Sequence, residues 1–264
     1  CNNYDELKKG YIEAEKVSFS DSVLIEDFVP NNSIVVIGRV SNGNFKICTV
    51  EDKYTVRYDK QGSYVAGLHL FESRKKSDFC DLYEKRIEEM LKHIGIKEGP
   101  VWFEVFVNGN EYCFNEVGFR YSGSVTIWPV QYFSKINEVA TDIYYALTGE
   151  SILDSFYSII SNSERKKKYC IYPLHIKPGT ITHVSGIEHL RKDKDFIAIP
   201  ITKKIGQTVE DTGTVAQVFA FVHFLYDTRQ ELEEKISYIH EVIRITDKNG
   251  NEMLNKMMNL RKVR

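Results

Sequence analysis

The alternation of apolar and polar positions along the chain predicts helices mixed with antiparallel hairpins. Two stretches, 33–50 and 101–119, each contain two strand-like runs separated by an Asn-Gly turn, the strongest short-range signal for a hairpin. Helical spacing is found over residues 3–18, 78–96, 134–151 and 228–243. The first and the last of these begin with a capping box, Asn3 with Glu6 and Thr228 with Glu231. We therefore expect an α+β fold made of hairpins and not of parallel βαβ units.

The other apolar runs are shorter. Strands are expected over 22–30, where Pro30 ends the run, and over 170–184, 196–202 and 215–225, with a short helix at 186–193. A polar, basic run at 161–169 separates the two parts of this pattern and is itself typical of a solvated loop. We expect it to mark a boundary between a domain of residues 1–160 and a smaller α+β domain of residues 161–264.

Composition excludes several classes of partner. The net charge of −2 and the isoelectric point near 6.4 give no reason to expect nucleic acid or an anionic membrane surface. The longest apolar run, at 215–226, is too short to span a bilayer. Five cysteines are scattered without a Cys-x-x-Cys pair, so neither a zinc site nor a disulfide framework is expected, and a cytoplasmic location fits best.

Two carboxylates in the second hairpin are the first candidates for chemistry. Glu104 and Glu116 lie on either side of its turn near residue 109 and should pair almost opposite each other across the two strands. Like charges placed in this way repel each other unless a cation lies between them. Mg²⁺ shared by the two carboxylates, with a polyphosphate beside it, would explain the pair, and Arg120 just beyond the strand would contact phosphate oxygens. The alternative is two glutamates on an exposed face of the sheet.

The same residues resemble a known family. "PVWFEVFVNGNEYCFNEVGFRYSG" at 100–123 resembles the C-terminal half of the ATP-grasp fold, in which a glutamate on one strand is followed by Glu-x-Asn-x-Arg-x-x-Gly on the next. "VLIEDFVP" at 23–30 is similar to the segment that borders the adenine pocket in this family. "VEDKYTV" and "GLHLFES" resemble segments of its amino-acid ligase branch. Residues 176–250 are similar to that branch's small C-terminal domain, which is itself like part of biotin carboxylase.

The resemblance implies an ATP- and Mg²⁺-dependent carboxylate–amine ligase that acts through an acyl phosphate on small-molecule substrates. It implies that the backbone of Glu26–Val29 meets the adenine, with Asp27 and Phe28 between the two contacting residues. Glu104 and Glu116 would then hold Mg²⁺, and Arg120 would contact the γ-phosphate or the acyl phosphate. Lys53 would face phosphate or substrate, although a surface lysine at a sheet edge is an equal alternative. His69 would line the substrate end, although a lone loop histidine is more often structural.

Several departures from the family pattern leave a second interpretation open. Gly118 stands where a metal-ligating asparagine is usual, Ser33 stands near a usual acid, and no proline precedes Ser73. The family's glycine-rich lid loop, its phosphate-binding lysines and its N-terminal domain would precede Cys1. We therefore expect either a fragment of a longer enzyme, inactive by itself, or a degenerate module that binds a nucleotide without turnover. The oligomeric state stays open, with a homodimer as one alternative.

Overall fold

The computed structural model describes residues 1–29, 33–58, 64–152 and 167–263. It divides into two compact units, Cys1–Pro30 and Asn31–Arg264, and each unit is described by itself below. No helix in these described ranges is long and apolar enough to cross a membrane.

The N-terminal unit is a single helix followed by an extended segment. Helix α1, Tyr4–Glu15, begins at the expected capping box, in which Asn3 Oδ1 accepts a hydrogen bond from the Glu6 amide at 2.9 Å. No side chain of this fully described helix is buried. The strand expected at 22–30 is wrong, because the described part of it, residues 22–29, has no regular structure. A strand needs a partner for its backbone hydrogen bonds, and the described residues of this unit form no other strand.

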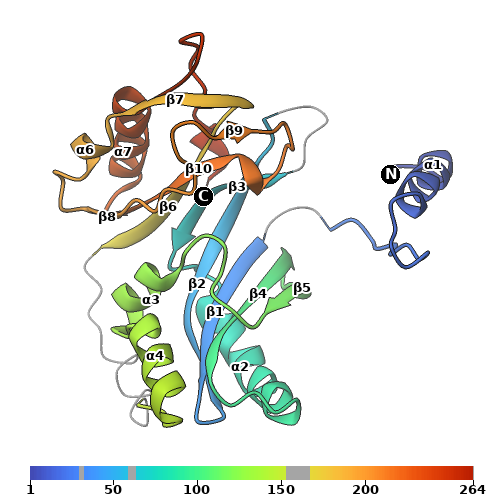
Figure 1. Ribbon diagram of the computed structural model, residues 1–264. Coiled ribbons are helices and arrows are strands. Elements are labelled where there is room, and N and C mark those ends of the chain that lie inside the picture. Colours follow the sequence, from blue (N-terminus) through green and yellow to red (C-terminus); the bar gives the residue numbers. More distant parts are fainter. Residues whose placement is uncertain (30–32, 59–63, 153–166, 264) are drawn as a thin grey trace. The chain divides into compact units, whose positions relative to one another are not determined.

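The second unit is built on an eight-stranded antiparallel sheet with the order β5-β4-β1-β2-β3-β6-β10-β8 (Figure 1). The strands are β1 Ser33–Ser41, β2 Asn44–Val56, β3 Val65–Phe71, β4 Gly99–Asn108, β5 Glu111–Gly118, β6 Lys168–His175, β8 Phe196–Ala198 and β10 Val218–Tyr226.

Both predicted hairpins are confirmed. In the turn between β1 and β2, Asn42 and Gly43 have φ values of 50° and 77°, as the tightest hairpin turn requires at its two central residues. In the turn between β4 and β5, Gly109 has φ 61°. Each turn sets the register of the residues next to it. A register shift further along each pair, at Ile37/Gly38 and at Glu104/Val105, then moves the remaining partners by one residue.

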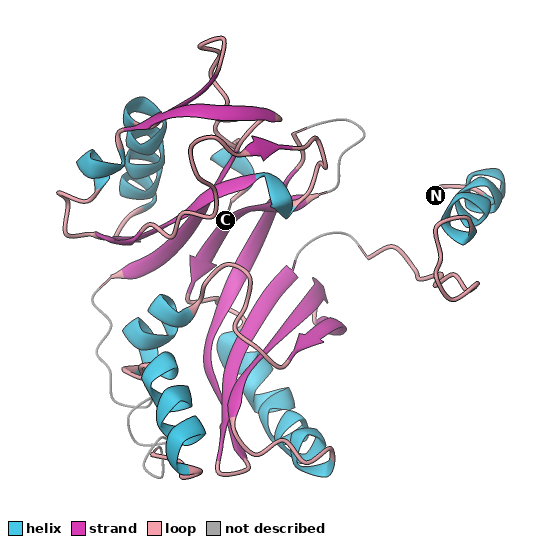
Figure 2. Cartoon of the chain, in the orientation of Figure 1, coloured by secondary structure: helices cyan, strands magenta, loops and turns pink. Residues whose placement is uncertain are grey.

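Helices cover opposite faces of the sheet. Helix α2, Lys76–His93, packs Phe79, Ile87 and Leu91 against one face. Helix α3, Ile127–Ser134, which the sequence pattern did not reveal, packs Val130 and Phe133 against the other. Helix α4, Glu138–Thr148, follows it. Figure 2 shows the loop that leaves β5 and crosses the sheet to reach α3.

The C-terminal part continues the same sheet and adds a second one. A three-stranded sheet, β11-β7-β9, packs with α7 on a shared apolar core that includes side chains of β6 and β10. Its elements are β7 Gly179–Ser185, α6 Ile187–Leu190, β9 Thr208–Val209, α7 Arg229–Val242 and β11 Arg244–Asp247, and short 3₁₀ helices lie at Val215–Gln217 and Leu260–Lys262. The strand expected at 196–202 is shorter than predicted, because β8 begins at Phe196 and ends at Ala198. The strand expected at 215–225 begins later, because β10 is Val218–Tyr226.

The expected domain boundary falls within 153–166, outside the described residues. Strands from both sides of it belong to one sheet, because β3 pairs with β6 through His69 and Ile171. The division into domains 1–160 and 161–264 stays a prediction.

Candidate functional site

The strand register brings charged residues together on the face of the sheet that α3 covers. Glu51, Val35 and Glu104 are successive cross-strand neighbours on β2, β1 and β4, and Glu116 on β5 is the register partner of Glu104. The sequence-based expectation that Glu104 and Glu116 lie opposite each other is therefore confirmed. Two residues after Glu51 on β2, Lys53 is the register partner of His69 on β3.

A cavity of about 330 Å³ lies on this face. The strands contribute Glu51, Lys53, His69 and Glu104 to its wall. Further lining comes from Ser122, Gly123 and Ser124 in the loop before α3, from Thr202 and Lys203, and from apolar residues that include Val35, Trp102, Val218 and Phe221. Residues far apart in the sequence therefore meet at one hollow, and three of the sequence-based candidates, Lys53, His69 and Glu104, are among them.

Lys53 and Glu104 form an ion pair across β1. The Lys53 ammonium group donates a hydrogen bond to Glu104 Oε1, and both side chains are less than a fifth exposed. Lys53 lies on a strand in the middle of the sheet, with β1 and β3 on either side. The alternative interpretation of Lys53 as a lysine at a sheet edge is therefore wrong. Its cation lies instead beside the carboxylate that was expected to bind metal.

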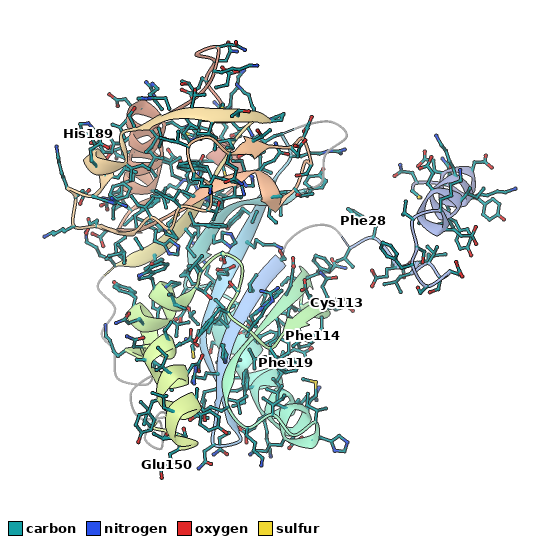
Figure 3. The ribbon with its side chains drawn as sticks, viewed as in Figure 1. Phe28, Cys113, Phe114, Phe119, Glu150 and His189 are labelled. Carbon is teal, nitrogen blue, oxygen red and sulfur yellow. The ribbon has the colours of Figure 1, made fainter. Side chains whose placement is uncertain are left out.

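Glu116 lies in a more open position. Strand β5 is at the edge of the sheet, and most of its residues are exposed. Figure 3 labels Cys113 and Phe114 on this strand and Phe119 just beyond its end. Glu116 is itself exposed and is not among the residues that line the cavity. In the described parts of the chain, no group of three or more His, Cys, Asp or Glu side chains is arranged to hold a metal ion. Glu104 and Glu116 are the two facing carboxylates that this strand pair offers.

Trp102 fills the space beside Gly118. A Cβ atom on Gly118 would lie 2.2 Å from Trp102 Nε1 and 2.5 Å from Cε2. The guanidinium carbon of Arg120 lies over the same indole, 5.1 Å from the ring centroid. This distance is within the range of a cation–π contact. Arg120 also donates to the Tyr121 carbonyl at 2.9 Å. The indole therefore stands where an asparagine side chain would project, and Arg120 rests on Trp102 and does not line the cavity.

Glu51 is a site residue that sequence reasoning missed. It is 1% exposed, and its Oε1 lies 2.7 Å from Nδ1 of His69, which is 4% exposed. The signal was present in the stretch "TVEDKYTV", where Glu51 and Lys53 are separated by one residue and so point to the same face of one strand. Only the register with β3 shows that His69 lies beside them.

The expected adenine segment belongs to the N-terminal unit. Glu26–Val29 is extended chain without regular structure, and Phe28 is 81% exposed (Figure 3). The structure brings Lys53, Glu104 and His69 together in the second unit and leaves the role of Glu26, Asp27, Phe28 and Val29 as a prediction.

No family model matches this sequence, and no curated protein is detectably similar to it in sequence. Similarity to solved structures is extensive. Phosphoribosylglycinamide synthetase from Anaerococcus prevotii superposes with a TM-score of 0.68 at 17% identity, over 93% of this chain and 61% of that one. L-amino acid ligase from Bacillus licheniformis gives 0.65 at 15% identity, over 84% of this chain and 55% of that one.

A third structure is the biotin carboxylase domain of 2-oxoglutarate carboxylase from Hydrogenobacter thermophilus, solved with Mg²⁺-ADP and bicarbonate. It superposes with a TM-score of 0.68 at 13% identity, over 95% of this chain and 52% of that one. All three are ATP-grasp enzymes. This chain has an ATP-grasp fold. The α+β ATP-grasp fold expected from the sequence is thereby confirmed, and the chain spans between about half and three fifths of the length of these ATP-grasp structures.

Proposed function

We propose that this chain is part of an ATP- and Mg²⁺-dependent ligase that joins a small carboxylate to an amine through an acyl phosphate. The observation that supports this best is the cavity on the sheet face, where Lys53, Glu104 and the Glu51–His69 pair converge from neighbouring strands. A cavity with a few convergent charged groups in an otherwise apolar wall is typical of a small-molecule site.

The carboxylates fit the magnesium ion that this reaction uses. Mg²⁺ takes oxygen ligands and is usually held by one or two carboxylates, with phosphates and waters completing its shell. Glu104 and Glu116, as register partners on β4 and β5, provide two such ligands. The carboxylates would be its protein ligands, and when bound the ion would offset the negative charge of the phosphates. Gly118 offers no further side-chain ligand, and Trp102 covers the space beside it.

The basic residues have distinct roles in this proposal. The ion pair with Glu104 already fixes the side chain of Lys53. Lys53 can therefore offset the charge on a transferring phosphoryl group without a further loss of conformational entropy during the reaction. Arg120 would leave the Trp102 ring to contact a phosphate, at a cost of about 0.5–1 kcal/mol for an exposed cation–π contact. Charge-assisted contacts to phosphate are stronger than that, so nucleotide binding can offset the cost.

ATP binding is assigned to the extended segment Glu26–Val29. Its backbone has no regular hydrogen-bonding partners within the segment, and a carbonyl and an amide two or three residues apart can pair with the edge of an adenine ring. Substitution of side chains there should have little effect on affinity, since the proposed contacts come from the backbone. Replacing Val29 by proline removes the amide donor and should weaken ATP binding.

The proposal is tested in the full-length protein by trapping the acyl phosphate. Each of the twenty amino acids is offered as the carboxylate, with ATP, Mg²⁺ and hydroxylamine, and hydroxamate and ADP are measured together. We expect one or more acids to give equal amounts of hydroxamate and ADP, with both products lost in Glu104→Gln. Release of ADP without hydroxamate for any acid would contradict an acyl phosphate for this substrate class.

A non-catalytic nucleotide-binding module is the second candidate. Two observations favour it: the indole of Trp102 occupies the space of a third metal ligand, and Arg120 rests on that indole. This candidate predicts that calorimetry detects ATP binding to the full-length protein while no combination of acid and amine releases ADP. Dependence of ADP release on an added acid would exclude it.

A further inference from the structure

The cavity contains a buried carboxylate–imidazole pair for which nucleotide binding and phosphoryl transfer provide no role. Glu51 Oε1 and His69 Nδ1 are 2.7 Å apart, and both residues are almost completely buried. Their other polar atoms, Glu51 Oε2 and His69 Nε2, are buried and have no hydrogen-bond partner among the described residues. Both side chains line the cavity.

The geometry defines which proton the ring carries. Glu51 as a carboxylate can only accept a hydrogen bond, so His69 donates from Nδ1. A neutral imidazole that keeps its proton on Nδ1 has its lone pair on Nε2. Leaving buried polar atoms without partners costs free energy of about 1–3 kcal/mol each. The cavity wall therefore holds two acceptors, Nε2 and Oε2, that a ligand with N–H donors would satisfy.

The chemistry of the acceptors selects one of the two substrates. A carboxylate or a phosphate has only acceptor oxygens and would face two further acceptors. An amine, or the ammonium ion from which it forms, donates hydrogen bonds and matches both. We propose that His69, held by Glu51, accepts the proton from the attacking amine in the second half of the reaction; this rests on the proposed ligase function.

In the second half of the reaction the amine replaces the phosphate on the acyl carbon. The amine nitrogen forms a bond to the acyl carbon, and the bond from that carbon to the phosphate oxygen breaks, so that inorganic phosphate leaves with the electron pair. The ammonium ion gives one proton to His69 Nε2 and so becomes the neutral amine that attacks. The second proton, lost from nitrogen as the amide forms, leaves with the phosphate. Glu51 stabilises the imidazolium that results, as a carboxylate does for a histidine base in other enzymes. Glu51 is thus a positioning residue and acts through His69.

Other ionisable groups surround the pair. Lys53 is the register partner of His69 on β2, and Glu104 and Lys203 share the cavity wall. On the neighbouring strands β6 and β10, burial lowers the pKa of His175, and lowers the pKa of His223 to about 3, with a further lowering of both by the nearby His69. Both neighbours are therefore neutral near pH 7, and of the three rings His69 is the one hydrogen-bonded to a carboxylate.

The test compares two nucleophiles in the full-length protein, using the amino acid that gives the fastest hydroxamate formation. Hydroxylamine is largely unprotonated at neutral pH and needs little help from a base. L-alanine, offered as the amine, is an ammonium ion at pH 7. We expect Glu51→Gln and His69→Asn to keep hydroxamate formation within about twofold and to slow coupling to L-alanine by about 10²–10⁴-fold. The loss should shrink as the pH is raised toward the pKa of the amine.

Asp52→Asn is the matched control. Asp52 is the next residue of β2, lies outside the cavity wall and accepts a hydrogen bond from Ser73 at 2.6 Å. It should leave the ratio of the two rates unchanged. Nitrogen NMR of the histidine rings gives a readout that needs no turnover. In the wild-type protein at pH 8, His69 should carry its proton on Nδ1, and Glu51→Gln should shift the His69 resonances while Asp52→Asn does not.

The outcomes separate the proposal from the function on which it rests. Normal L-alanine coupling in His69→Asn would overturn the proton-acceptor role and leave the ligase function standing. An equal loss of rate with hydroxylamine and with L-alanine would also overturn the proton-acceptor role, because Glu51 and His69 would then serve an earlier step. A proton on Nε2 of His69 would contradict the geometry directly. If the wild-type protein forms neither hydroxamate nor ADP with any acid, the ligase function fails, and this proposal fails with it.

Discussion

Gly118 is the residue at which this chain departs most clearly from the family pattern, and its packing can be tested by adding one methyl group. In Gly118→Ala the new Cβ would lie 2.2 Å, 2.5 Å and 2.9 Å from three atoms of the Trp102 indole. Ordinary van der Waals contact begins at 3.4 Å. The strand position also has no positive φ, so the clash with the ring is the only evident penalty.

The magnitude follows from how firmly the ring is held. Trp102 is 8% exposed and belongs to the apolar cluster that joins the sheet to α3, so the ring cannot move without disturbing that packing. Overpacking of this kind typically costs about 1–3 kcal/mol. We therefore expect Gly118→Ala to lower the free energy of unfolding by about that amount.

The assay is urea unfolding of four proteins in a double-mutant cycle: wild type, Gly118→Ala, Trp102→Leu and the double variant. The smaller side chain should relieve the clash, so the cycle should give a coupling energy of about the same size as the single-mutant cost. Gly123→Ala is the control, because a Cβ there meets no atom within 4 Å, and it should change stability by less than about 0.5 kcal/mol. If Gly118→Ala lowers the free energy of unfolding by the same amount in the Trp102→Leu background, the clash with the indole is not the cause of the destabilisation.

Three further predictions concern charge and reactivity. Glu116→Gln should weaken Mg²⁺-dependent ATP turnover in the full-length protein at least about tenfold while changing urea stability by less than about 0.5 kcal/mol, because the residue is exposed; equal losses of both would argue for a structural role. Burial raises the pKa of Glu138 to about 7, against the attraction of Arg39. Between about pH 4.5 and 7 the folded protein therefore binds a proton that the unfolded chain releases. The free energy of unfolding should fall by ~3 kcal/mol over this range as the pH rises. Glu138→Gln should flatten this slope, and an unchanged slope in urea unfolding at a series of pH values would rule the assignment out. Titration with a thiol reagent should find two fast-reacting cysteines, Cys1 and Cys113, in the native protein and five after denaturation, because the other three are at least partly buried; rapid reaction of more than two would show that the packing is looser than described.

Much of the fold was predictable because its signals are local. The two hairpins depend on Asn-Gly turns whose positive φ values few other residues tolerate, and the helix caps at Asn3 and Thr228 are satisfied by amides three residues away. Counting from the turn pairs Glu104 with Asn115; a register shift between Glu104 and Val105 brings Glu116 opposite Glu104 instead, and the turn does not encode that shift. Predictions failed where structure depends on distant partners. Residues 22–29 have an apolar strand composition, but the described residues of their own unit form no strand with which they could pair. Helix α3 has eight residues and is stabilised by its packing against the sheet.

Some features of the candidate site were likewise predictable from the sequence, and others were not. The sequence pattern placed Glu104 and Glu116 on the two strands of one hairpin, whereas Lys53 lies beyond the predicted hairpin at 33–50. The register shift that brings Glu116 opposite Glu104 is a feature of the folded sheet. The order of the strands is also a property of the folded sheet, and with it the contact of Lys53 with Glu104 across β1 and the contact of Glu51 with His69. The tertiary structure also decided that Trp102 takes the space beside Gly118. Strand order is set by the joint burial of apolar faces against α2, α3 and α7, a property of the whole core that no local pattern encodes.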